Sequence, residues 1–302
     1  MKRLAVFIIS IIAIVLVADI AVGISCRYYI RNHELSGRYK PLDKLIKNVD
    51  TDIILIGNSI ILNAIDPQVL QDSLQMSCYN GGITGKSIQF SEILIDCILQ
   101  RHTPKTIIIA MRPEEAGANS GDGIFDVLKP YYNMGYESID NYFNSSSASE
   151  QLLLKSNLLR YNTIWVRVLL YTIFGQKDWS DNGFVANEVP AILPQIKTVD
   201  DTDTPIARKT DSFRRIVSKC QARGVHLVVC FPPALLHFTQ PSLPCVTAIS
   251  DICNQHGVEC YADYADSSFT NHPELFFDNY HMNRNGAEKY SRMLVRHITT
   301  KK

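Results

Sequence analysis

A serine and an Asp–His pair stand far apart in this sequence and could together perform nucleophilic chemistry. Ser59 follows the apolar run 53–57, and Asp278 precedes His281 by three residues, just before an expected helix. That spacing lets a carboxylate hold the imidazole, whose second nitrogen could then take a proton from a serine hydroxyl. Taken singly, each has a plainer interpretation: the serine as a turn residue after a strand, the histidine as a surface residue at a polar helix start.

The segments that would position these side chains alternate between strands and helices. Strands are expected at 53–57, 78–79, 106–111, 225–231 and 258–261, and helices at 66–74, 87–100, 211–223, 242–256 and 285–298. Asp66-Pro67 marks the start of the first helix as an N-cap followed by proline. This order predicts a parallel sheet with helices on both faces. Sites in such sheets form at the carboxyl ends of the strands, which is where Ser59 should lie.

Together these residues resemble the SGNH/GDSL hydrolase superfamily, whose fold is a flavodoxin-like three-layer α/β/α arrangement around a parallel sheet. Gly57-Asn58-Ser59 is similar to the family's nucleophile motif, with asparagine in place of aspartate. The last motif, Asp-x-x-His-x-Asn-x-x-Gly, is matched from Asp278 through His281 and Asn283 to Gly286. The resemblance covers roughly residues 50–115 and 210–300. It implies Ser59 as the nucleophile, His281 as its base and Asp278 as the carboxylate partner.

The resemblance also implies backbone N–H donors for an oxyanion, those of Ser59 and Gly85. Gly85 ends the stretch Asn80-Gly-Gly-Ile-Thr-Gly, which matches the family's second motif. The third motif departs, because the family has Gly-x-Asn-Asp after the third strand and this chain has Arg112-Pro-Glu-Glu. Glu114 and, further along, Asn119 are the candidates for that position. One missing donor is worth roughly 10²–10³ in rate. No metal or cofactor is implied.

The N-terminal stretch 4–25 is apolar, and its only charge is Asp19. As a helix it would span roughly 33 Å, enough to cross the hydrocarbon core of a bilayer. It is longer than the core of a signal peptide and follows Lys2 and Arg3, so we expect a retained single-pass anchor with the C-terminal domain outside the cytoplasm. Cleavage after the small-x-small triplet Ala21-Val22-Gly23 and a buried N-terminal helix are the alternatives. If Asp19 lies deep in the span, it needs a partner.

The expected organisation has four parts. They are a cytoplasmic stub at 1–3, a transmembrane anchor at 4–25, a juxtamembrane linker at 26–50, and an SGNH-like domain at 51–300 with an insertion at about 115–210. Within the insertion, apolar residues at helical spacing between 149 and 174 predict one or two helices. These helices could form a lid beside the cleft or an additional packing layer remote from it.

The charge balance and the cysteines exclude some classes of partner. Lys+Arg and Asp+Glu both number 30, so there is no global basic field and no indication of nucleic-acid binding. None of the eight cysteines has CxxC spacing, which makes a zinc site improbable. Cys245, Cys253 and Cys260 could include a disulfide if the domain is exported.

The function implied is two-step acyl transfer from an ester, most simply acetyl, through an acyl-enzyme on Ser59. Membrane-anchored relatives resembling the DltD and alginate-acetylation proteins suggest an envelope polysaccharide or an acylated small glycan as substrate, and a membrane-bound acyltransferase as partner. The missing third-motif asparagine leaves open a catalytically quiet accessory protein that binds such a glycan or such an acyltransferase. An unrelated doubly wound binding protein is the third alternative, which contact between Ser59 and His281 would exclude.

Overall fold

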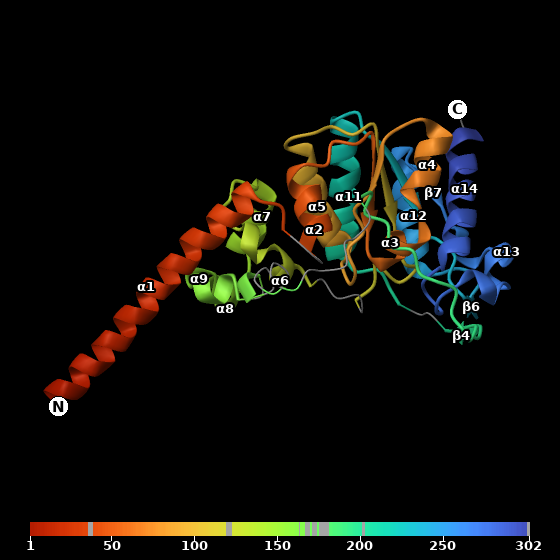
Figure 1. The fold of residues 1–302 in the computed structure, drawn as a ribbon. Coiled ribbons are helices and arrows are strands. Elements are labelled where there is room, and N and C mark those ends of the chain that lie inside the picture. Colours follow the sequence, from red (N-terminus) through yellow and green to blue (C-terminus); the bar gives the residue numbers. More distant parts are fainter. Residues whose placement is uncertain are drawn as a thin grey trace. The chain divides into compact units, whose positions relative to one another are not determined.

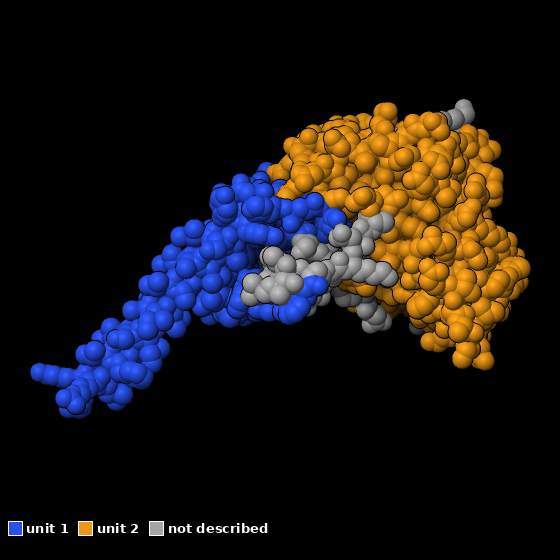
Figure 2. Space-filling view, in the orientation of Figure 1, with its two compact units in different colours: residues 1–43, 124–178 blue, residues 44–123, 179–302 orange. Residues whose placement is uncertain are grey.

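The computed structural model describes residues 1–35, 39–118, 123–162, 164–166, 170, 174, 181–200 and 203–300 (Figure 1). The chain divides into two compact units, which Figure 2 shows in different colours. We call Met1–Asp43 with Ile124–Asp178 the helical unit, and Lys44–Gly123 with Trp179–Lys302 the sheet unit. Ser59, Asp278 and His281 all belong to the sheet unit.

The sheet unit is built on five parallel strands. They are β1 (Ile53–Gly57), β2 (Cys78–Asn80), β3 (Thr106–Ala110), β5 (His226–Cys230) and β7 (Glu259–Tyr261). Their spatial order is β2-β1-β3-β5-β7, with every neighbouring pair parallel. Counted along the chain this is the order 2-1-3-4-5 of flavodoxin-like folds. Every residue of β1 and β3 is buried, as expected for apolar, β-branched strands covered on both faces. The predicted fold class is confirmed.

Helices cover both faces of this sheet. They are α3 (Ser59–Ala64), α4 (Pro67–Leu74), α5 (Ile88–Leu99), α11 (Ala207–Ala222), α12 (Pro244–His256), α13 (Ser267–Thr270) and α14 (Arg284–Thr300). Short 3-10 turns lie at Asp263–Ala265 and Pro273–Leu275. Helix α14 packs against α3 and α4, while α11 packs against α5 and α12 (Figure 1). The result is the predicted three-layer arrangement.

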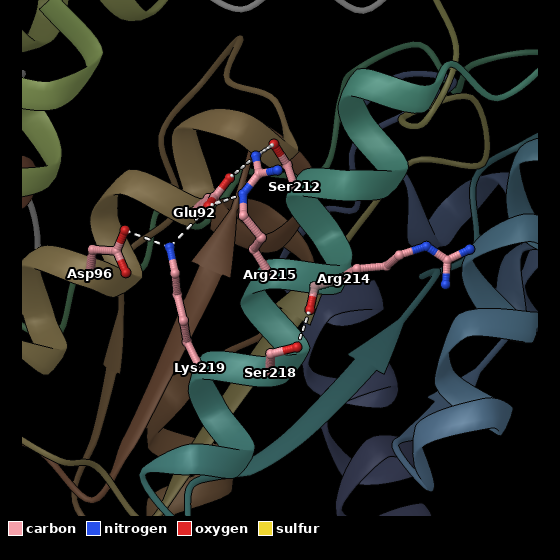
Figure 3. A network of polar contacts seen from close by, with 7 residues as sticks. All are labelled: Glu92, Asp96, Ser212, Arg214, Arg215, Ser218 and Lys219. Atoms are coloured by element: carbon pink, nitrogen blue, oxygen red, sulfur yellow. Dashed lines mark hydrogen bonds and ion pairs between the residues drawn. The ribbon is translucent and has the colours of Figure 1, made fainter. Parts of the chain in front are cut away.

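An ionic network holds α5 against α11 (Figure 3). The Arg215 guanidinium donates to both carboxylate oxygens of Glu92, at 2.7 and 2.8 Å. Lys219 Nζ donates to Glu92 at 2.9 Å and to Asp96 at 2.7 Å. Burial alone would raise the pKa of Glu92, but the hydrogen bonds from Arg215 and Lys219 outweigh it and lower that pKa. The carboxylate therefore stays charged and keeps both helices on the same face of the sheet.

The helical unit contains a long apolar helix and several short ones. Its elements are α1 (Lys2–Asn32), α6 (Ile124–Leu128), a 3-10 turn at Lys129–Tyr131, α7 (Glu137–Asn144), α8 (Ala148–Lys155) and α9 (Asn157–Arg160), and α2 (Lys40–Lys47) begins in it. Helix α1 is long and apolar enough to cross a membrane and continues beyond the predicted end at residue 25. Asp43 ties the chain after α1 to the 3-10 turn, accepting from Leu35 N–H at 2.9 Å and from the Tyr131 hydroxyl at 2.8 Å.

The first part of the predicted helical stretch 149–174, up to Arg160, forms two helices, α8 and α9. Ser156 separates them and caps α9 by accepting a hydrogen bond from Leu159 N–H. Positions 168, 169 and 173, which contributed to the helical spacing, lie outside the described residues. The lid hypothesis concerns how this stretch is placed against the sheet unit, and it stays a prediction.

Some elements were not foreseen in the sequence. Helix α3 follows β1 directly, although Ile60 and Ile61 are β-branched and read more like strand residues. Strands β4 (Lys197–Val199) and β6 (Leu236–Phe238) pair in a second, two-stranded parallel sheet, in stretches where no strand was predicted. Helix α11 begins at Ala207 rather than at the predicted residue 211. Three-residue strands gain their stability from a distant partner, so their local sequence carries little signal.

Candidate active site

The serine, the histidine and the aspartate form one continuous chain of hydrogen bonds. His281 Nε2 lies 2.9 Å from Ser59 Oγ. The other ring nitrogen, Nδ1, lies 3.0 and 2.9 Å from the two carboxylate oxygens of Asp278. With Nδ1–H donating to Asp278, Nε2 is free to accept from the Ser59 hydroxyl. This arrangement can move a proton off the serine as its oxygen attacks.

Asp278 is held in place by the loop that carries it. Its Oδ1 accepts hydrogen bonds from the backbone N–H groups of Tyr280 and His281, both at 2.8 Å. Burial acts to raise the pKa of Asp278, but the bond from the His281 ring and these two backbone bonds prevail and lower it. The aspartate is therefore ionised where it can support a charged imidazole.

The rest of the last motif fastens this loop to the start of α14. Asn283 is fully buried, its amide donates to the Glu274 carbonyl at 2.8 Å, and its oxygen accepts from Gly286 N–H at 3.1 Å. A Cβ added at Gly286 would overlap the carbonyl oxygen of Leu275. Asparagine and glycine at these positions are thus structural requirements of the loop that presents His281.

The turn after β1 sets the direction of Ser59. A Cβ at Gly57 would lie 2.5 Å from the carbonyl oxygen of Ala110, so a glycine is needed where β1 ends beside β3. Asn58 then caps α3, its Oδ1 accepting from Ile60 N–H at 2.8 Å. Ser59 is the first residue of that helix and lies at the carboxyl end of β1, the edge predicted for it.

The two places where the sequence departs from the family pattern touch each other. Asn58 Nδ2 donates to Glu115 Oε2 at 2.7 Å, and Glu115 is only 3% exposed. Burial raises the pKa of Glu115 to about 7, although Arg112, Lys209 and the Asn58 hydrogen bond act in the opposite direction. An aspartate at position 58 would set a second carboxylate against Glu115, whereas asparagine donates a hydrogen bond to it. The two departures are therefore one paired feature.

Glu115 was missed in the sequence, where Glu114 and Asn119 were the candidates for the third-motif position. Glu114 is partly buried and pairs with Arg112, whose Nη1 lies 3.3 Å from Glu114 Oε1. Asn119 lies outside the described residues. One signal in the sequence could have found Glu115. Both the first and the third motif depart from the family pattern, and both follow strands of a parallel sheet, which places them at the same edge.

The second motif packs against the turn of the serine. Asn80 is fully buried, and its amide donates to the Ile61 carbonyl of α3 at 2.8 Å. Ile83 N–H donates to the Gly57 carbonyl at 2.9 Å. Gly85 lies two residues further on, exposed, with a φ of +71° that favours glycine. Its part as an oxyanion donor stays a prediction.

An open pocket is lined in part by Ile60 and Tyr280, the sequence neighbours of the serine and the histidine. It is lined by Ile60, Met111, Arg112, Pro113, Glu114, Pro232, Ala234, Leu236 and Tyr280, and together with the solvent at its mouth it holds about 240 Å³. Most of these residues lie in the segments directly after β3 and β5, and Ile60 follows Ser59 after β1. The pocket therefore opens at the carboxyl edge of the sheet. Apart from the Arg112–Glu114 pair its wall is mostly apolar, which suits a small acyl group.

No protein-family model and no curated protein matches this sequence. Among solved structures, a lipase/acylhydrolase from Enterococcus faecalis is 12% identical, with a TM-score of 0.41 over 82% of this chain and 95% of that one. A catalytic mutant of an acetylxylan esterase from Geobacillus stearothermophilus is 10% identical, with a TM-score of 0.41 over 82% and 93%. Esterase EstA from Pseudoalteromonas sp. is 11% identical, with a TM-score of 0.40 over 83% and 98%. Likeness at this level assigns neither activity nor substrate, which must come from this chain's own side chains.

Proposed function

We propose that this chain is a membrane-anchored serine esterase or O-acyltransferase of the SGNH/GDSL type. The observation that carries the proposal is the hydrogen-bonded chain from Asp278 through His281 to Ser59, with 2.9 Å between His281 Nε2 and Ser59 Oγ. If Ser59 were only a turn residue and His281 only a surface residue, no hydrogen bond between them would be expected across 222 residues. Contact between them also argues against an unrelated binding protein.

The chemistry follows from this geometry. Ser59 Oγ attacks the ester carbonyl while its proton passes to His281 Nε2, and the Asp278 carboxylate stabilises the imidazolium. The backbone N–H groups of Ser59 and Gly85 are the proposed donors to the oxyanion. His281 then gives the proton to the departing alkoxide, leaving an acyl group on Ser59. Water or a sugar hydroxyl, deprotonated by His281, takes that acyl group and restores the serine.

The pocket and the anchor limit the class of substrate that we propose. The pocket is small, mostly apolar and bordered by the charged Arg112–Glu114 pair, which favours a short acyl group such as acetyl over a long alkyl chain. Helix α1 is long and apolar enough to cross a membrane, which favours action at the membrane. We propose that the C-terminal domain lies outside the cytoplasm, because Lys2 and Arg3 precede the apolar stretch. We therefore propose acyl esters of a cell-envelope polysaccharide or a small acylated glycan as the substrate, and a membrane-bound acyltransferase as the partner, as in the DltD-like and alginate-acetylation-like branch.

Labelling with a fluorophosphonate probe tests the nucleophile on the full chain in detergent. Ser59→Ala should lose the label, and Ser73→Ala, at an exposed position on α4, should keep it. The wild type should also hydrolyse p-nitrophenyl acetate faster than p-nitrophenyl octanoate. Labelling that persists in Ser59→Ala would mean that the nucleophile is assigned wrongly.

A catalytically quiet accessory protein is the second candidate, because Glu114 places a carboxylate on the pocket wall. That charge would oppose a nearby oxyanion, so Glu114→Gln should raise the esterase rate if the side chain reaches the reaction centre. Should the wild type neither take up the probe nor hydrolyse the ester, binding of an acetylated glycan in the same pocket becomes the better account. Protease digestion of the domain in intact spheroplasts tests its outward orientation.

A further inference from the structure

Within the helical unit, the one acidic residue in the apolar part of α1 is engaged by the start of α9. Asp19 Oδ1 accepts from the Ser156 hydroxyl at 2.7 Å and from Leu158 N–H at 2.9 Å. Its Oδ2 accepts from Asn157 Nδ2 at 2.9 Å. The partner that an acidic residue in a membrane span requires is therefore the N-terminus of a short helix from a distant part of the chain.

Two further residues of α1 extend this contact. A Cβ at Gly23 would overlap the Asn157 side chain, and Arg27 Nη1 donates to Asn157 Oδ1 at 3.2 Å. Asp19, Gly23 and Arg27 are spaced by four, so they lie on one face of α1. We call these three residues together with Asn157 the α1–α9 seam. It holds α9 beside α1 within this unit (Figure 1).

The length of α1 defines how deep in the membrane the α1–α9 seam lies. About 20 helical residues are needed to cross a hydrocarbon core of about 30 Å, and counted from Leu4 they end near Gly23. Asp19 then lies roughly 6 Å inside that boundary, at about 1.5 Å per residue. Because α9 is bonded directly to Asp19, α9 must reach the same level.

Three leucines are exposed on α8 and α9, beside the polar Ser149, Gln151 and Lys155 of α8. Leu152, Leu153 and Leu159 are 65%, 42% and 46% exposed. On α8, Leu154 is the buried residue, and helical geometry turns Leu152 and Leu153 away from it. Helices that face water carry polar residues on that side, whereas helices lying in a membrane interface carry leucine there. Trp165, 43% exposed, is a residue type enriched at the same level of the bilayer.

We propose that α8 and α9 lie in the interfacial layer of the bilayer that α1 spans, with Leu152, Leu153 and Leu159 against the lipid acyl chains. The α1–α9 seam sets their depth. A lipid bilayer is the occupant of these exposed leucines because α9 packs directly on α1, whose own apolar side chains are exposed and long enough in sequence to cross a membrane. The chain would thus sit on the membrane through a helical platform as well as through its anchor. This inference rests on the proposed membrane anchor and not on the proposed enzymatic function.

Quenching by brominated lipid tests the platform on the full chain in phosphatidylcholine vesicles. Leu152→Trp adds a fluorophore to the proposed lipid-facing surface, and Asn254→Trp adds one at an exposed position of α12 in the sheet unit. After subtraction of the wild-type emission, vesicles with brominated acyl chains should remove about half of the light added by Leu152→Trp, since interfacial helices bury their apolar face by ~5–10 Å. Asn254→Trp should be unaffected. Equal quenching of the two variants overturns the proposal, as does unquenched Leu152→Trp, which would point to a protein on this face.

A second substitution tests the seam. In the Leu152→Trp background, Gly23→Leu keeps α1 apolar but drives a side chain into Asn157, so most of the lipid quenching should disappear. Ala21→Leu, on the exposed side of α1, is the matched control and should retain it. Flotation of both variants with the vesicles checks that the anchor still inserts. If Gly23→Leu leaves the quenching unchanged, the seam does not set the depth of α8 and α9.

Discussion

Replacing Glu115 by glutamine should remove a loss of stability that the wild type undergoes as the pH rises. Glu115 is 3% exposed, and burial raises its pKa from 4.5 to about 7. The folded state therefore holds this proton more tightly than the unfolded state does. The stability that the proton contributes is complete below about pH 4.5 and is lost as the pH rises through about 7. At about 1.4 kcal/mol per pH unit, the difference between the two pKa values corresponds to about 3 kcal/mol.

The assay is thermal unfolding of the full chain in detergent micelles, followed by circular dichroism between pH 5 and pH 8. About 3 kcal/mol corresponds to roughly 6–12 °C in Tm for a domain of this size. Part of the loss has already occurred at pH 5, so between pH 5 and pH 8 the wild type should lose most of that Tm relative to Glu115→Gln, which still offers an oxygen to Asn58 Nδ2. Glu114→Gln should keep most of the wild-type loss, reduced somewhat because the charge of Glu114 contributes to the raised pKa of Glu115. If the wild type and Glu115→Gln stay parallel over this range, Glu115 does not titrate in the way its burial requires.

The same reasoning predicts what the family's aspartate would do at position 58. Asn58→Asp places two carboxylates where the structure has a 2.7 Å amide-to-carboxylate bond. The variant should be less stable than the wild type at pH 8, and adding Glu115→Gln should recover most of the loss. A coupling of about 1–3 kcal/mol in this double-mutant cycle is expected for groups in direct contact. Additive effects would show that the two departures from the motif are independent.

The remaining predictions concern the triad and its loop. Ser59→Ala and His281→Ala should each remove nearly all hydrolysis of p-nitrophenyl acetate, roughly 10³-fold or more, and the double variant should be no worse, because the two groups act as a unit. Asp278→Asn should reduce kcat less than either, since it disturbs the imidazole without removing it; a larger loss than in His281→Ala would contradict the assigned role. Gly286→Ala should lower Tm and activity together, because the new methyl overlaps the Leu275 carbonyl; an unchanged Tm would show that the loop can move aside.

Much of the fold could be predicted because its signals are local. The apolar, β-branched runs of β1 and β3 are buried on both faces, and such runs need no knowledge of their neighbours to be recognised. The start of α4 was equally readable, because Asp66 caps it by accepting from Gln68 N–H, directly before Pro67. The boundaries of α5 and α12 differ from the expected ones by only a residue or two.

The candidate site could likewise be predicted only in part from the sequence. Asp278 and His281 are three residues apart in one loop, so the sequence by itself determined that they could meet. That His281 also meets Ser59, across 222 residues, depends on the sheet order that brings the end of β1 to the loop before α14. The resemblance anticipated this meeting, but no local pattern in either segment contains it.

Other decisive contacts had no anticipation in the sequence. Asn58 and Glu115 are 57 residues apart, and only the pairing of β1 with β3 shows that they are partners. The apolar stretch of α1 was evident from composition, whereas the engagement of Asp19 by α9, across 137 residues, was not. Local composition determines which segments form helices and strands, because burial and periodicity act along the chain. Which polar groups satisfy one another is decided by tertiary packing, because each buried group takes whichever partner the fold brings within about 3 Å.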